Sequence, residues 1–204
     1  MKDLDFIEIG TSNFDTLVQT CEDDSVGICV EPIKHYLDQL PNKKNILKVN
    51  VAITGDLVHD KKIKIYYIPE DIIVKERLHR LIRGCNKIGD YHPLHIKNKL
   101  THLVKIDDVE LVNIGEFLKN NKIRKIKHLR IDTEGHDVNI MKGLYNYICN
   151  LPEEFHPFEI KFETNSNTTN KEVDEVIELY STLNYGVVFR KLDTLIKKSG
   201  IIKK

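Results

Sequence analysis

Short apolar runs alternate with amphipathic stretches along this chain, and this alternation restricts its fold more than any other feature. The apolar runs 6–9, 26–30 and 46–53 predict strands, and the stretches 14–21 and 33–40 between them predict helices. Strand, helix and strand at this spacing are typical of right-handed crossovers between parallel strands. We therefore expect an α/β fold built on a parallel sheet.

The second half of the chain repeats this pattern. The same periodicities predict two strands, three helices and a closing hairpin: strands 126–131 and 158–162, helices 114–120, 138–149 and 169–183, and hairpin strands 185–190 and 193–196. The expected sheet is mostly parallel, with an antiparallel C-terminal hairpin and helices on both faces.

The middle of the chain is less regular. Segments 64–68 and 107–112 predict extra strands, and 83–94 predicts a loop because Gly, Asn, Asp and Pro gather there. We expect a single domain over residues 1–204, with an inserted loop region at about 60–110. Long ordered loops are often functional, so this region is a candidate lid over the site.

The charge balance gives no electrostatic reason to bind nucleic acid or an anionic membrane, since Lys+Arg and Asp+Glu both number 31. No apolar run approaches the roughly 18 residues that span a bilayer, and the first residues do not resemble a secretion signal. The cysteines form no CxxC pair. We expect a cytoplasmic protein with reduced thiols that binds neither a membrane nor nucleic acid.

A first candidate site follows the first predicted strand. Glu8 precedes the turn, Gly10 lets the backbone approach a ligand, and Ser12 lies in a polar run that offers backbone N–H groups. Ligands of open α/β sheets lie at the carboxyl ends of strands. Many ordinary strand–helix turns look the same, so this turn alone does not separate a ligand site from a connection.

Glu31 and Pro32 strengthen the case for a nucleoside ligand. Glu31 ends the second strand about 20 residues beyond Gly10, the spacing at which an acid accepts hydrogen bonds from both ribose hydroxyls. A dinucleotide site would need G-x-G-x-x-G, and only one of these glycines is present. The pattern favours a cofactor without phosphates, such as S-adenosylmethionine (SAM), whose ammonium group Glu8 would attract. The alternative for Glu31 is a solvated acid.

Residues 129–137 form the third candidate, a strand that ends at Ile131 and a polar cluster before an apolar helix. Segment 131–136, Ile-Asp-Thr-Glu-Gly-His, resembles the Ile-Asp-Val-Glu-Gly-His block of FkbM-type SAM-dependent methyltransferases. In the same order, 8–10, 30–32 and 49–53 resemble the first SAM motif of this family, its ribose-binding Glu-Pro step and the strand beside the adenine. The resemblance spans most of the chain.

This resemblance implies a Rossmann-like class I methyltransferase fold, SAM as cofactor and methyl transfer, usually to oxygen and often on a sugar or natural product. It also implies a role for each matching residue: Glu8 and Gly10 face the methionine part of SAM, Glu31 with Pro32 holds the ribose, Asn50 and Val51 lie near the adenine, and Asp132 and Glu134 lie near the cofactor and the acceptor.

A hydroxyl acceptor benefits from a general base. His136 is a plausible base because imidazole titrates near neutrality, and Asp132 and His92 are alternatives. Asp132 is the strongest candidate of the catalytic region, because it ends a central strand where substrates gather. His136 could instead be an exposed residue in the first turn of a helix, and Glu134 could simply stabilise that helix N-terminus. His92 and His95 are spaced like a metal pair, but no Cys or acid completes a known spacing, so no metal is expected.

We expect a SAM-dependent O-methyltransferase that acts on a sugar or another small hydroxylated acceptor. No additional substrate domain is visible, which disfavours the first alternative, a methyltransferase for protein or nucleic acid. Phe14 replaces the glycine that ends the first family motif, and 113–115 reads Asn-Ile-Gly instead of Thr-Leu-Asp. These departures keep open a second alternative, a catalytically silent SAM-binding or interaction domain.

Overall fold

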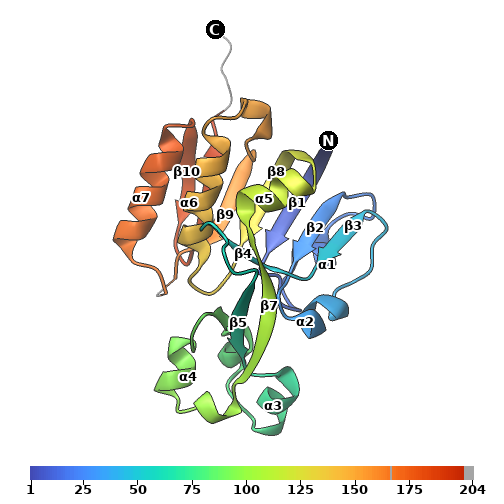
Figure 1. The fold of residues 1–204 in the computed structure, drawn as a ribbon, viewed down its shortest axis with the longest axis vertical. Helices are drawn as coiled ribbons and strands as arrows, with labels where there is room; N and C mark the ends of the chain where they lie inside the picture. The colour runs from blue at the N-terminus through green and yellow to red at the C-terminus, as the bar shows by residue number, and fades with distance from the viewer. Residues whose placement is uncertain (166, 200–204) are drawn as a thin grey trace.

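A seven-stranded sheet forms the main layer of the protein (Figure 1). It is seen in a computed structural model that describes residues 1–165 and 167–199. The strand order is β10-β11-β9-β8-β1-β2-β3. These strands are β1 (Lys2–Ile9), β2 (Gly27–Val30), β3 (Ile46–Val49), β8 (Ile123–Ile131), β9 (Glu159–Glu163), β10 (Tyr185–Arg190) and β11 (Asp193–Lys198).

The pairing of the strands confirms the mostly parallel sheet and its antiparallel hairpin. Strands β3, β2, β1, β8 and β9 are parallel to one another, and β11 is antiparallel to both β9 and β10. All four residues of β2 and the last four of β1 are buried. Such continuous burial is expected for parallel strands that are covered on both faces.

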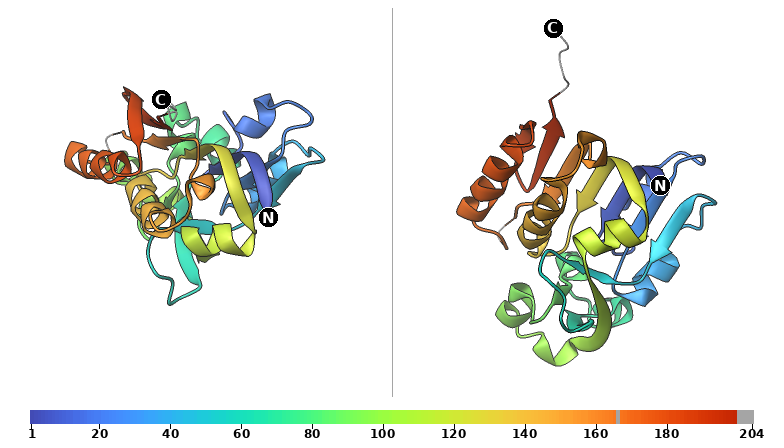
Figure 2. Two further views of the ribbon diagram at one scale, coloured as in Figure 1. Left: turned by 90° about the horizontal axis from the view of Figure 1, so that it is seen from above. Right: turned by 45° about the horizontal axis from the view of Figure 1, so that its top comes forward.

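Helices cover both faces of this sheet, as expected (Figure 2). Helices α5 (Ile114–Asn120), α6 (Asp137–Ile148) and α7 (Asn170–Ser181) lie on one face, and α1 (Leu17–Thr20) and α2 (Lys34–Gln39) lie on the other. A capping box between Thr169 and Glu172 begins α7. None of the helices in the described part of the chain has the length and hydrophobicity of a membrane span.

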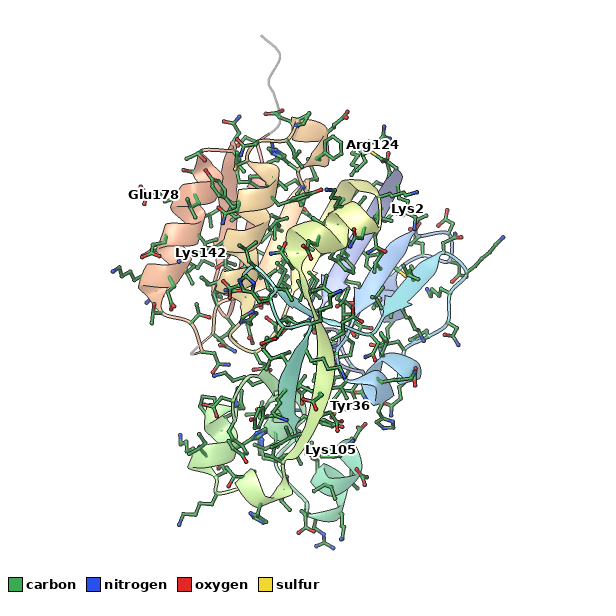
Figure 3. All side chains as sticks on the ribbon, viewed as in Figure 1. Lys2, Tyr36, Lys105, Arg124, Lys142 and Glu178 are labelled. Atoms are coloured by element: carbon green, nitrogen blue, oxygen red, sulfur yellow. The ribbon has the colours of Figure 1, made fainter. Side chains whose placement is uncertain are left out.

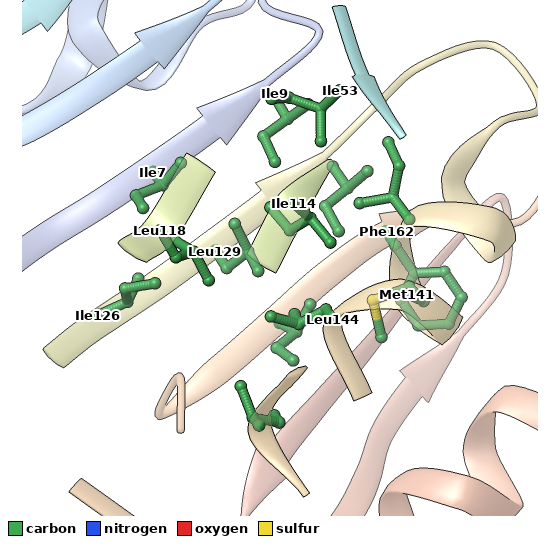
Figure 4. Packing of buried hydrophobic residues seen from close by; sticks show 14 of the residues in the cluster. Ile7, Ile9, Ile53, Ile114, Leu118, Ile126, Leu129, Met141, Leu144 and Phe162 are labelled. Atoms are coloured by element: carbon green, nitrogen blue, oxygen red, sulfur yellow. The ribbon is translucent and has the colours of Figure 1, made fainter. Parts of the chain in front are cut away.

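The larger core lies between the sheet and α5–α7 (Figure 4). The strands β1 and β8 contribute Ile7, Ile9 and Leu129, and α6 contributes Met141 and Leu144, all of them buried. Burial of each such side chain stabilises the fold by roughly 1.5–3 kcal/mol. A smaller cluster packs on the other face and consists of Phe6, Val18, Cys29, Leu37 and Leu40.

The first helix is shorter than the prediction for 14–21, because α1 covers only Leu17–Thr20. Ser12 and Asp15 have φ angles of 49° and 52°. These left-handed conformations do not fit a right-handed helix. The chain between β1 and α1 is therefore a loop at the carboxyl end of the sheet.

The single strand predicted at 46–53 is two strands in different sheets. β3 ends at Val49, and β4 (Ala52–Thr54) pairs with a strand outside the main sheet. Asn50 lies at the break, where its side-chain amide donates hydrogen bonds to the carbonyl oxygens of Glu31 and Pro32. Asn50 thus turns the chain out of the main sheet and ties it to the end of β2.

The segment between β4 and α5 is a folded insertion rather than a loop region. Strands β5 (Lys62–Tyr67), β6 (Lys87–Ile88) and β7 (Lys105–Asn113) join β4 in a second sheet, in the order β4-β7-β5-β6. The extra strands expected at 64–68 and 107–112 are therefore confirmed. Short helical elements connect them: α3 (Glu70–Lys75), the 3-10 helices η1 (Arg80–Gly84) and η2 (Thr101–Leu103), and α4 (Pro93–Lys97); a third 3-10 helix, η3 (Glu153–Phe155), precedes β9.

The prediction of a loop over 83–94 is wrong. This stretch contains the end of η1, all of β6 and the beginning of α4. Its polar and turn-forming residues end these short elements instead of forming one continuous loop. Pro93, for example, is the first residue of α4, a position where the missing N–H costs nothing.

The insertion lies beyond the carboxyl ends of the parallel strands (Figure 1). Tyr36 of α2 is buried, and its ring centroid lies 6.2 Å from that of Tyr67 in β5. Ile33 and Ile65 complete this cluster. Figure 3 shows Tyr36 where the main sheet meets the insertion. This packing holds the insertion over the edge of the sheet where ligands of α/β folds bind.

Candidate functional site

A cavity lies between the carboxyl ends of the parallel strands and the insertion. Its walls come from the turns after β1, β2 and β8, from β4, and from the insertion, and its lining residues are Ile9, Gly10, Thr11, Ser12, Phe14, Asp15, Val30, Glu31, Pro32, Val51, Ala52, Ile53, Ile65, Gly84, Asn86, Ile88, Arg130, Asp132, Thr133, Glu134, His136 and Glu163. Among the residues predicted for the site, Glu8, Asn50 and His92 do not line it.

Glu31 is buried at one end of the cavity, with 3% of its surface exposed. Its Oε2 accepts a hydrogen bond from Ser12 N at 2.7 Å, and its Oε1 accepts one from Ile33 N at 2.8 Å. Burial raises the pKa of Glu31 to about 7. Each carboxyl oxygen keeps a second lone pair for a donor in the cavity.

The turn after β1 brings backbone close to the cavity. Gly10 has φ of +80° and its N–H donates to the carbonyl oxygen of Val30, so it joins the ends of β1 and β2. Ser12 also adopts a left-handed conformation, which directs its N–H at Glu31. The hydroxyl oxygen of Ser12 is buried and has no hydrogen-bond partner among the described residues. This turn therefore presents an unused polar atom to a ligand.

The wall beside Glu31 is apolar. Val51 comes from the β3–β4 connection, Ala52 and Ile53 come from β4, and Ile65 and Ile88 come from the insertion. Asn50 is exposed and holds the β2–α2 turn from outside through the carbonyl contacts already described. A flat aromatic group can lie against such a wall without leaving a polar group unpaired.

Three acids gather at the other end of the cavity. Asp132, Glu134 and Glu163 each offer a carboxyl oxygen within 4.8 Å of the others. Burial, followed by the charges of Glu134 and Asp132, raises the pKa of Glu163 to about 9. Oxygens at this spacing also suit a divalent cation, so the absence of a metal remains a prediction from the sequence.

Arg130 is the cation nearest to these acids. Its guanidinium group lies 3.2 Å from Asp132 Oδ2 and 3.2 Å from Glu8 Oε1. Glu8 is 1% exposed and also accepts a hydrogen bond from Leu17 N at 2.8 Å. Burial raises the pKa of Glu8 to about 7. Glu8 thus supports the cavity from behind, through Arg130 and the first turn of α1.

Asp137 fixes the two turns that carry the acids. It is fully buried, and its carboxylate accepts hydrogen bonds from Thr133 N, Thr133 Oγ1, Gly135 N and Glu163 N. Burial raises the pKa of Asp137 to about 7. One side chain therefore joins the turn after β8 to the end of β9.

The two histidine candidates lie in different environments. His136 lines the cavity and is partly buried, with its Nε2 3.1 Å from Thr54 Oγ1, and burial lowers its pKa. His92 is 3% exposed and caps α4 by accepting a hydrogen bond from Leu94 N. The Nε2 of His92 lies 3.4 Å from Glu134 Oε2. His92 therefore connects the insertion to an acid of the cavity.

The two departures from the family pattern have structural explanations. Phe14 lines the cavity, and the guanidinium carbon of Arg83 lies 4.6 Å from its ring centroid. Asn113 caps α5 by accepting from Gly115 N and Glu116 N. A Cβ atom on Gly115 would lie 2.8 Å from the Tyr147 ring. Phe14 thus forms a contact with the insertion, and Asn113 and Gly115 form a helix start.

Sequence reasoning missed Glu163, and it assigned no role to Arg130 or Asp137 although both lie in the candidate segment 129–137. Glu163 follows the apolar strand predicted at 158–162 as directly as Asp132 follows the strand at 126–131. The same rule for strand ends would have found it. Arg130 is itself a strand residue, and the sequence does not show which way its side chain points.

The fold and the cavity define a Rossmann-like methyltransferase domain. A family model for the methyltransferase FkbM domain matches residues 9–187, which is most of the chain. The chain therefore belongs to the FkbM methyltransferase family, and the family resemblance expected from the sequence is confirmed. Comparisons with curated proteins and with solved structures gave no match.

Proposed function

We propose that this methyltransferase transfers the methyl group of SAM to a hydroxyl group of a small acceptor, such as a sugar. The observation that carries the proposal is the buried Glu31 carboxylate, which faces a cavity with an apolar wall. Each of its oxygens accepts one backbone N–H and can accept one hydroxyl of a cis-diol. A ribose supplies two adjacent hydroxyl groups in this arrangement.

The chemistry of the remaining donors also fits SAM. The adenine would lie against Val51 and Ile53, and the unpartnered Ser12 hydroxyl would face the cofactor. SAM carries positive charge on sulfur and on its ammonium group, and three acids, of which Asp132 is paired with Arg130, supply the complementary charge. When bound, SAM supplies a methyl group that is activated by the positive sulfur.

The insertion supports a small acceptor. Gly84, Asn86 and Ile88 of the insertion line the cavity, and the Arg83–Phe14 and His92–Glu134 contacts join the insertion to two further lining residues. A covered cavity positions the acceptor against the methyl group and keeps water out. His136 lines the same cavity and is a candidate to orient the acceptor hydroxyl.

We further propose a cytoplasmic protein without a nucleic-acid partner. Its four cysteines are free thiols in the structure, as expected for a reducing compartment. The balanced charge of the chain gives no general attraction to a polyanion.

Calorimetry with SAM and with S-adenosylhomocysteine tests the cofactor assignment. The variant Glu31→Gln should bind both at least roughly tenfold more weakly, because a buried charged hydrogen-bond acceptor is lost. Glu178→Gln is the matched control, since Glu178 lies on α7 away from the cavity. Unchanged affinity in Glu31→Gln would contradict the ribose assignment.

An acceptor screen with methyl-labelled SAM tests the reaction. Transfer of label to sugars or other small alcohols supports the proposal. Transfer only to protein or nucleic acid supports a macromolecular acceptor instead. Binding of SAM without transfer to any of these classes identifies a silent binding domain.

A further inference from the structure

The register of the sheet places four residues in one row along the rim of the cavity. Ile9 pairs with both Val30 and Ile131, and Ile131 pairs with Phe162. The next residues along these strands are Gly10, Glu31, Asp132 and Glu163. They follow the strand order β2-β1-β8-β9. Because neighbouring strands lie about 4.8 Å apart, Glu31 and Glu163 are separated by roughly 14 Å across three strand spacings.

This separation assigns the two acids to different ligands. If Glu31 holds the ribose, the sulfur of SAM, a few covalent bonds away, lies over the ends of β1 and β8. The acceptor then approaches the methyl group from the side of β9. Glu163 is the residue at the end of β9 that lines the cavity.

The Glu163 carboxyl group has one unused oxygen. Its Oε1 accepts a hydrogen bond from the side chain of Asn165. Its Oε2 is buried and has no hydrogen-bond partner among residues 1–165 and 167–199. A buried polar atom without a partner destabilises the fold, so native proteins contain few of them. A hydroxyl group of the acceptor would supply the missing donor.

We propose that Glu163 is a catalytic residue that accepts a hydrogen bond from the reacting hydroxyl of the acceptor and takes its proton during methyl transfer. This inference rests on the proposed function. It names a residue that the sequence analysis did not select, and it places the acceptor at the β9 end of the cavity.

The step conserves atoms and charge. A lone pair of the acceptor oxygen forms the bond to the methyl carbon, and the electron pair of the broken carbon–sulfur bond returns to sulfur. The proton of the hydroxyl moves to Glu163 Oε2. A positive sulfur and a negative carboxylate therefore become neutral together, which is favourable in a cavity where charges are poorly solvated.

The surroundings of Glu163 favour it over the other candidate bases. Burial raises the pKa of Asp132 as well, but its pairing with Arg130 opposes this rise and thus weakens Asp132 as a base. His136 is held against the Thr54 hydroxyl. Burial makes Glu163 a stronger base than an ordinary carboxylate, with a pKa of about 9, and a positive ligand in the cavity favours its ionised form.

Sinefungin provides a test that does not require the acceptor. In this SAM analogue, a carbon that bears an amino group replaces the methylated sulfur, so the amino group takes the place of the transferable methyl. S-adenosylhomocysteine has nothing at this position. Calorimetry with both ligands therefore measures what the protein places beside the methyl site. A charge-assisted contact predicts that wild-type protein binds sinefungin at least roughly tenfold more tightly.

In the variant Glu163→Gln, the ratio of the affinity for sinefungin to the affinity for S-adenosylhomocysteine should fall to about one. The affinity for S-adenosylhomocysteine should stay at the wild-type value. The retained affinity shows that the variant is folded. Glu159→Gln is the matched control, because Glu159 lies on the same strand outside the cavity and should keep the preference.

Three results would overturn the assignment of Glu163. The first is equal affinity of wild-type protein for both ligands. The second is a preference for sinefungin that stays unchanged in Glu163→Gln. Loss of this preference in Asp132→Asn but not in Glu163→Gln is one form of the second result. The third is a preference that disappears in EDTA and returns with Mg²⁺, since a metal would then occupy the acidic cluster. If neither ligand binds wild-type protein, the proposed function itself fails.

Discussion

Gly10 lies so close to the backbone of Asp132 that a Cβ atom on Gly10 would stand 1.9 Å from the Asp132 carbonyl oxygen. The backbones of the turn after β1 and of the end of β8 thus lie in direct contact. Any larger residue at position 10 must push these two strand ends apart, and both of them line the cavity.

We predict that Gly10→Ala lowers the free energy of unfolding by about 3 kcal/mol, because it adds a steric clash to an unfavourable positive φ. Chemical denaturation measures this change. Gly89 is the control, since it has φ of +82° but open space around a Cβ atom, so Gly89→Ala should cost only about 1 kcal/mol. Equal losses in the two variants would show that the close approach is unimportant.

Asp137→Ala should destabilise the protein by roughly 3 kcal/mol, because it leaves the partly buried N–H groups of Thr133 and Glu163, and the N–H of Gly135, without their acceptor. Thermal and urea unfolding measure the loss. Asp38→Ala is the comparison, since Asp38 is exposed and pairs with Lys34 on the same helix; this change should have almost no effect. A similarly small loss of stability in Asp137→Ala would contradict the role of Asp137 in joining β8 and β9.

Glu163 also predicts a pH dependence of stability in the ligand-free protein. Its pKa rises from 4.5 to about 9 on folding, so the folded state binds a proton that the unfolded state has released. This contribution is fully present below about pH 4.5 and is lost as pH rises through about 9. Melting temperatures between pH 5 and 9 should therefore fall less steeply for Glu163→Gln than for wild-type protein. Parallel curves would contradict the raised pKa.

Arg83 connects the insertion to the cavity through the Phe14 ring and through Glu70, whose Oε1 lies 2.8 Å from the guanidinium group. We predict that Arg83→Ala weakens SAM binding by up to roughly tenfold, because Phe14 loses its cation–π partner. Arg80→Ala is the matched control, since Arg80 is an exposed residue of the same 3-10 helix. Calorimetry with SAM on both variants measures the difference. Equal SAM affinities of the two variants would show that the Arg83–Phe14 contact does not contribute to cofactor binding.

The strand ends of the site could be predicted because each follows an apolar run. Gly10, Glu31 and Asp132 were found in this way, and Glu163 obeys the same rule. The sequence does not contain the order of the strands, however, and only that order places the end of β9 beside the end of β8. The proximity of Glu163 to Asp132 is therefore a result of the tertiary fold.

The insertion was less predictable for a related reason. β4 and β6 have only three and two residues, which is too short for a recognisable alternation of polar and apolar side chains. The break at Asn50 depends on two carbonyl groups that only the folded β2–α2 turn presents. The left-handed Asp15 shortens α1 in a way that residue type alone does not indicate, because it is not glycine.

The insertion enters through β4 and leaves through β7, and these strands pair side by side from Ala52–Leu111 to Thr54–Asn113. A segment whose two ends are neighbours can grow, shrink or change sequence without moving the strands on either side. The wall of the cavity that the insertion supplies can thus diverge during evolution while the strand ends that carry Gly10, Glu31 and Asp132 stay constant. One donor-binding scaffold could in this way serve relatives with different acceptors.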